Sequence, residues 1–154
     1  MGLTNGYVFE LCTKLKLNVI GVVACNTPIS LMKNDIIIFN LDEKHKPGSH
    51  FVCIYCDGKK VYYFDPLGFR CYNPFIIKIL TDMKLPVFEY EFPIQSILSN
   101  FCGYFCVAFA IKASIKMSDK LFFQQFDMKN NLINDEISVK FITKYIDKYL
   151  FVWK

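Results

Sequence analysis

The chain has 154 residues, a formal net charge of +4 from 18 basic and 14 acidic residues, and 53% hydrophobic residues. This length predicts one domain, residues 1–154, and the hydrophobic content excludes a disordered chain. The basic residues are scattered rather than gathered in a stripe, which favours a solvated surface over a specific nucleic-acid site.

The first third of the chain predicts a helix followed by strands. Residues 7–17 place apolar side chains among polar ones, which predicts a helix. Residues 19–25 and 35–39 are rich in β-branched side chains and predict two strands. Residues 42–49 are charged and contain Pro47-Gly48, which predicts a loop with a turn.

A β-hairpin is predicted after this loop. His50 precedes the apolar run 51–56, Asp57-Gly58 is a turn signal, and residues 61–64 predict the returning strand. Pairing across the turn brings the start of the first strand next to the end of the second. We therefore expect the His50 imidazole to lie near the Asp65 carboxylate.

A helix and a strand are predicted between the hairpin and the loop that carries Gln95. Residues 74–84 begin with Pro74 and end before Pro86, which predicts a helix. Residues 87–92 alternate as a strand does. Gln95 then follows just past the end of this strand.

Cys102 opens the most apolar stretch. Residues 102–116 are apolar on nearly every face, which predicts a helix buried at the centre of the domain. Ser99 or Asn100 offers an N-cap, which puts Cys102 in the first turn, where free N–H groups and the helix dipole stabilise a thiolate. Gly103 leaves room for a substrate backbone. The same pattern also fits a core helix that merely begins with Cys.

The end of the chain predicts a last helix. Apolar side chains recur at helical spacing over residues 134–149, with Asn134 as the N-cap. The predicted fold class is therefore α+β, with a mixed β-sheet packed on a central buried helix that bears Cys102 and with flanking helices.

Four residues, His50, Asp65, Gln95 and Cys102, supply in order the groups that a cysteine protease needs. Each alone means little, because most His are structural and most Cys are buried as small apolar groups. Together they predict acyl transfer. Cys102 attacks the carbonyl, His50 moves the proton, Asp65 orients the imidazole, and the Gln95 amide holds the oxyanion.

These motifs resemble the adenovirus-type cysteine proteases, the adenain family, within the superfamily of ubiquitin-like protein proteases. The resemblance rests on His50-Phe51, on residues 63–69 (YFDPLGF), and on Gln95 seven positions before Cys102-Gly103. It implies a papain-like, adenain-like fold and an endopeptidase that cleaves viral precursor proteins at Gly-containing sites during virion maturation. It also implies a location in the host nucleus and virion, with Phe51 and Gly103 next to the substrate.

The chain departs from the family at several positions. Phe51 stands where the family usually has Trp, and Asp65 stands where adenain-like enzymes often carry Glu. Residues 83–85 contain no Cys, although adenain has a Cys in the corresponding stretch that bonds to a viral activating peptide. Covalent activation is therefore not expected. Activation by a viral peptide or by DNA, with weak non-specific DNA binding, is what the resemblance implies.

Two other functions stay open. The same superfamily includes isopeptidases that remove ubiquitin or ubiquitin-like modifiers, so the chain also fits a deubiquitinase or deSUMOylase. The third possibility is an inactive binding module with the same fold. The presence of all four residues, His50, Asp65, Gln95 and Cys102, argues against it.

The remaining thiols suggest no metal or disulfide. Cys53 and Cys56 have ligand-like spacing, and Cys102 and Cys106 lie one helical turn apart. A strand, however, sends positions three apart to opposite faces, so Cys53 and Cys56 cannot share a ligand. We therefore expect no metal and no required cofactor. The first six residues lack the features of a signal peptide, and no apolar run is long enough to span a membrane, so we expect an intracellular protein with reduced thiols.

Overall fold

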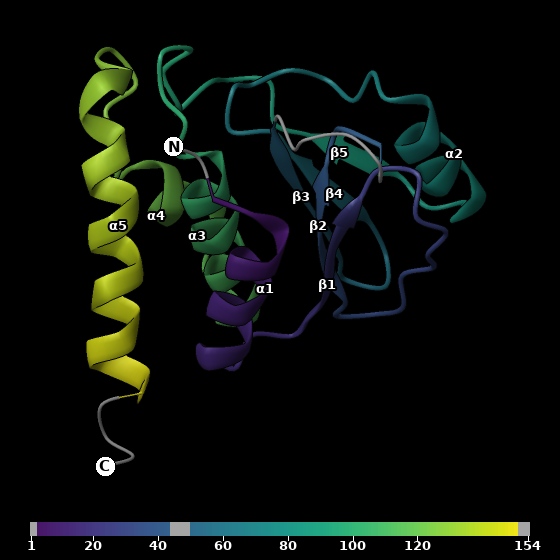
Figure 1. Cartoon of the computed structure of the whole chain (residues 1–154), viewed down its shortest axis with the longest axis horizontal. Helices are drawn as coiled ribbons and strands as arrows, with labels where there is room; N and C mark the ends of the chain where they lie inside the picture. Colours follow the sequence, from purple (N-terminus) through teal and green to yellow (C-terminus); the bar gives the residue numbers. More distant parts are fainter. Residues whose placement is uncertain (1–2, 44–49, 151–154) are drawn as a thin grey trace.

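A five-stranded mixed sheet lies at the centre of the structure (Figure 1), a computed structural model that describes residues 3–43 and 50–150. The strands follow one another in chain order across the sheet. They are β1 (Val19–Ala24), β2 (Ile36–Asn40), β3 (Phe51–Cys56), β4 (Val61–Phe64) and β5 (Val87–Glu89). The outer pairs, β1 with β2 and β4 with β5, are parallel, and the two inner pairs are antiparallel.

The β3–β4 hairpin confirms the pairing predicted from the sequence. Cys53 lies opposite Phe64, and Cys56 lies opposite Val61. The turn between them is closed by the Asp57 carboxylate, which accepts hydrogen bonds from the two backbone N–H groups that follow Gly58. Gly58 has a φ of +91°, a conformation that glycine adopts without strain. The predicted turn at Pro47-Gly48 lies outside the described residues.

Helices cover both faces of the sheet. They are α1 (Asn5–Lys14), α2 (Pro74–Asp82), α3 (Cys102–Ser114), α4 (Asp119–Phe123) and α5 (Asn134–Tyr145), with a 3-10 turn η1 (Asn131–Ile133) and a π-helical turn η2 (Ile146–Leu150). Figure 1 shows α1, α3 and α5 on one side of the sheet and α2 on the other. The apolar core is divided accordingly into two clusters, one on each face. The coarse prediction, an α+β chain with a mixed sheet and several helices, is confirmed.

The helix that bears Cys102 is the most buried element. Eleven of the thirteen residues of α3 are buried, as the lack of a polar face in the sequence predicted. It packs on β2 and β3 on one side and on α5 on the other. Since both sides of α3 are covered, its position relative to the sheet is strongly determined.

Several predicted helix caps and element boundaries are wrong. No side chain caps α3, so neither Ser99 nor Asn100 has the predicted capping role; Phe101 precedes the helix. Asn134 does not cap α5, because its side chain bonds to two other segments of the chain. The strand predicted over residues 87–92 ends at Glu89, and the short helix α4 was not predicted. Among the described residues, no helix is long and apolar enough to cross a membrane.

Candidate active site

The hairpin brings His50 and Asp65 into direct contact. His50 Nε2 lies 2.7 Å from Asp65 Oδ1, and Asp65 is only 1% exposed. His50 is held just before β3 by its carbonyl, which accepts a hydrogen bond of 2.9 Å from the backbone N–H of Leu41. The predicted meeting of imidazole and carboxylate is therefore confirmed as a geometric relationship.

A tight turn fixes the Asp65 carboxylate. Its Oδ1 atom also accepts a 2.8 Å hydrogen bond from the backbone N–H of Leu67, and the N–H of Gly68 donates to the Asp65 carbonyl. Gly68 has a φ of +79°, and a Cβ there would lie 2.6 Å from the backbone nitrogen of Pro93. Only glycine fits this turn, both for its φ and for the close approach of the second chain segment. This accounts for the sequence Asp-Pro-Leu-Gly.

The same turn positions the loop that carries Gln95. The Pro66 carbonyl accepts hydrogen bonds from the backbone N–H groups of Ile94 and Gln95, each 3.0 Å long. The Gln95 side chain is 2% exposed, and its Nε2 donates a 3.1 Å hydrogen bond to the Ser99 carbonyl. Gln95 is thus tied to the turn after Asp65 on one side and to the segment that enters α3 on the other.

Cys102 begins α3 and its side chain interacts with His50. Cys102 is 7% exposed, and its side chain lies near enough to His50 to raise the pKa of that imidazole. Because Nε2 of His50 faces Asp65, the other ring nitrogen, Nδ1, is the one available to Cys102. No side chain caps the described start of α3, so its first N–H groups remain available to an anion.

The pKa of His50 reflects these opposing surroundings. Burial of the ring lowers it, but the hydrogen bonds and charges of Asp65 and Cys102 raise it more, to about 9 from an ordinary value of 6.5. With a pKa of about 9, the imidazole stays protonated at neutral pH. This arrangement can hold a thiolate next to an imidazolium and can give a proton to a leaving group.

A second layer of polar contacts, which the sequence analysis did not predict, holds Gln95. Ser99 Oγ donates a 2.6 Å hydrogen bond to Asp135 Oδ1 at the start of α5 and accepts one from the Phe101 N–H. Polar residues before a helix are usually read as caps. Here Ser99 instead connects Gln95 to a helix 36 residues further along the chain.

Phe51 and Gly103 do not occupy the substrate-facing positions expected for them. Phe51 is 3% exposed and belongs to the core beneath α3. A Cβ on Gly103 would lie 3.1 Å from Leu3 Cδ1 and 3.2 Å from Val8 Cγ2. Gly103 therefore makes room for the N-terminal segment and α1 of the chain itself. This corrects the expectation that it makes room for a substrate backbone.

Five of the six other cysteines are buried in the core as small apolar side chains, and Cys71 is partly buried. Cys53 and Cys56 belong to different apolar clusters, on opposite faces of the sheet, as expected for positions three apart on a strand. Burial raises the pKa of Cys53 and Cys106 well above the ordinary thiol value. Among the described residues, no group of three or more His, Cys, Asp or Glu side chains is placed to hold a metal ion.

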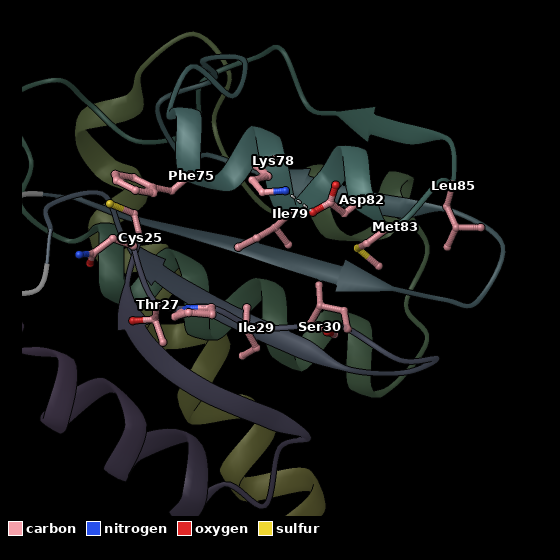
Figure 2. A pocket seen from close by; sticks show the side chains of 13 residues that line it. Cys25, Thr27, Ile29, Ser30, Phe75, Lys78, Ile79, Asp82, Met83 and Leu85 are labelled. Carbon is pink, nitrogen blue, oxygen red and sulfur yellow. Dashed lines mark hydrogen bonds and ion pairs between the residues drawn. The ribbon is translucent and has the colours of Figure 1, made fainter.

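One large cavity contains none of the residues His50, Asp65, Gln95 and Cys102. It has a volume of about 810 Å³ and lies between the loop after β1 and helix α2. Figure 2 shows its lining side chains, with Ile29 and Ser30 on the loop and Ile79 and Met83 on or just after the helix. It offers no nucleophile paired with a base, so we assign the candidate active site by chemistry rather than by cavity size.

No protein-family model matches the chain, and no curated protein matches it in sequence. The candidate active site is defined by the arrangement of His50, Asp65, Gln95 and Cys102.

Proposed function

We propose that the protein is a cysteine peptidase in which Cys102 is the nucleophile and His50 the general base and acid. The observation that carries the proposal is the placement of His50 between the Asp65 carboxylate, at 2.7 Å, and the Cys102 thiol at the start of α3. A nucleophile, a base and a buried acid in this order form a triad in which each group acts on the next.

The reaction proceeds through a thioester. The Cys102 thiolate attacks the substrate carbonyl carbon, and the carbonyl oxygen becomes an oxyanion. The His50 imidazolium then gives its proton to the leaving nitrogen as the C–N bond breaks. Water, deprotonated by His50, attacks the thioester carbon, the C–S bond breaks, and the carboxylic acid product leaves with the thiolate restored.

Two groups are proposed to hold the oxyanion: the Gln95 side chain and the backbone N–H of Cys102. An amide NH₂ carries two protons, and one of those on Gln95 is used by the Ser99 carbonyl. Nε2 also donates to Ser99 Oγ over a longer distance of 3.4 Å, and this weaker contact is the one that the developing charge would displace. A donor that is already fixed before the reaction stabilises the transition state at little further cost in ordering.

The resemblance of the motifs to adenain supports a more specific proposal. In it, the fold is adenain-like, and the enzyme cleaves viral precursor proteins at Gly-containing sites during virion maturation, in the host nucleus and virion. Activation by a viral peptide or by DNA and weak binding of DNA are part of this proposal.

A panel of probes tests the chemistry and the substrate class together. We expect wild-type protein, but not Cys102→Ala, to cleave candidate viral precursor proteins at Gly-containing sites. Vinyl sulfone derivatives of ubiquitin and ubiquitin-like modifiers provide the second arm. If one of these probes labels Cys102 and the precursors are not cleaved, the protein is an isopeptidase rather than an endopeptidase. If the precursors are not cleaved and Cys102 is not labelled, the protein is an inactive binding module.

A further inference from the structure

A groove of about 520 Å³ shares Gln95 with the candidate active site. One wall comes from the turn after β4 and the loop before α3, and it includes Phe69 and Ile97. The other wall comes from the segment between α4 and α5, and it includes Met128 and Leu132. The groove therefore begins at the residue that we propose as the oxyanion donor.

The walls of the groove expose large apolar side chains. Ile97 is 83% exposed, Leu132 is 65% exposed, and Phe69 and Met128 are each about half exposed. Exposed apolar side chains that gather around one groove mark a surface that binds a partner, because water is a poor environment for them. Lys129 is the one charged side chain among the described residues that line the groove.

Two buried oxygens of this groove lack a hydrogen-bond donor. They are Gln95 Oε1 and Asn131 Oδ1, both in residues that line it, and both are closed off from solvent. A buried acceptor without a donor costs free energy, because it has lost its hydrogen bonds to water. Such atoms are therefore candidates for contact with a ligand that brings N–H groups.

The two walls are joined in a way that makes the groove a built feature. The side chain of Asn134, which is fully buried, donates to the carbonyls of Ile94 and Asp127 and accepts from the Asp127 N–H, each at 2.8 Å. Ile94 leads into one wall, and Asp127 leads into the other. A single side chain thus fixes the distance between the segments that flank the groove.

We propose that this groove binds the polypeptide substrate beside the scissile bond and takes one of its apolar side chains. The inference rests on the proposed function, because it uses Gln95 as the point where substrate and catalytic groups meet. A peptide offers the backbone N–H groups that Gln95 Oε1 and Asn131 Oδ1 lack. Its apolar side chain matches Phe69, Ile97 and Leu132, while a basic side chain is disfavoured by Lys129.

Neither oxygen is accessible to solvent in this structure, so binding has a structural consequence. A peptide reaches them only if the two amides rotate or the segment from Met128 to Leu132 moves. Binding should therefore change the signals of the Gln95 and Asn131 side chains themselves. This gives a readout that does not depend on catalysis.

The test measures binding to Cys102→Ala protein by NMR of side-chain amides. The probe is a set of acetylated octapeptides that carry Leu, Ala or Lys at one position at a time. We expect Leu-containing peptides to shift the Gln95 and Asn131 amide signals and the Lys peptides to bind at least tenfold more weakly. Ile97→Gln and Leu132→Gln, made in the same background, should weaken binding at least tenfold. Met32→Gln, which changes a 74% exposed residue that does not line the groove, should alter it less than twofold.

Three results would contradict the proposal that this groove binds the substrate. They are the absence of binding by any peptide, binding that leaves both amide signals unchanged, and binding that the two groove variants do not weaken. Concentration-dependent shifts without peptide would also overturn it, since they would assign the surface to a second copy of the chain. The proposed function fails by a different result, namely a Cys102 thiol that is no more reactive than Cys106 in the wild-type protein.

Discussion

Phe64 stacks on Phe109 with ring centroids 4.5 Å apart and ring planes only 5° from parallel. Phe64 directly precedes Asp65, and Phe109 lies two turns after Cys102 on α3. The stack therefore joins the strand that leads to Asp65 to the helix that begins at Cys102. Both rings are almost completely buried, so the relationship is fixed by core packing.

Removal of this stack should destabilise the whole domain. Phe109→Ala deletes a buried ring and should lower the free energy of unfolding by about 3–5 kcal/mol, measured by urea denaturation. Phe9→Ala, at a position on α1 that is 43% exposed, is the matched control and should cost much less. Equal losses in the two variants would mean that the stack has no special role in the core.

Only one thiol should be required for turnover. Cys102→Ala should abolish cleavage while the circular dichroism spectrum stays unchanged, because it removes the nucleophile and little volume. Cys106, one helical turn further on, is fully buried, so Cys106→Ala should retain activity with a stability cost of roughly 1 kcal/mol. A folded but inactive Cys106→Ala protein beside an active Cys102→Ala protein would contradict the assignment.

Asp65 should orient the His50 imidazole and favour its protonated form. Asp65→Asn should lower kcat by on the order of tenfold or more, but by less than His50→Ala does. Asp65 raises the pKa of His50, so its loss should also move the alkaline limb of the pH–rate profile to lower pH. If kcat and the alkaline limb of the pH–rate profile are both unchanged in Asp65→Asn, another acid orients His50.

The raised pKa of His50 also makes stability depend on pH. The folded-state pKa of about 9 lies above the ordinary value of 6.5, so the folded protein holds this proton more tightly than the unfolded chain. The resulting stabilisation is fully present below pH 6.5 and is lost as the pH rises through about 9. Urea denaturation across this range should show the decline, and His50→Ala should remove this contribution to it. A wild-type curve identical to that of His50→Ala would contradict the proton linkage.

Gln95 should act on the transition state. Gln95→Ala should lower kcat by roughly 10² with little change in KM, because the lost hydrogen bond strengthens only as the oxyanion develops. Gln124→Ala, at an exposed glutamine that ends α4 and does not line the groove, is the control and should change kcat little. A defect of Gln95→Ala that lies wholly in KM would remove Gln95 from the oxyanion hole and leave that role to backbone N–H groups.

The sequence predicted the elements that local patterns determine. The hairpin was predictable because the turn at Asp57-Gly58 and the apolar runs beside it specify the pairing, and with it the contact between His50 and Asp65. The burial of α3 was predictable because the helix has no polar face. These features depend on short stretches of chain.

The parts that could not be predicted depend on contacts between distant segments. Asn134 reads as an N-cap in the sequence, but its side chain joins Ile94 to Asp127. Gly103 reads as space for a substrate, but the space is filled by Leu3 and Val8. In both cases a residue type has several possible uses, and only the tertiary contacts determine which one applies.

The most direct test of the account is the rate at which iodoacetamide alkylates each thiol at pH 6.5, measured by peptide mass spectrometry. This test needs no knowledge of the substrate. We predict that Cys102 reacts faster than the buried thiols Cys12, Cys53 and Cys106, and that His50→Ala slows its reaction at least tenfold because the imidazolium no longer stabilises the thiolate. A Cys102 that reacts as slowly as Cys106, or at the same rate with and without His50, would contradict the proposed nucleophile.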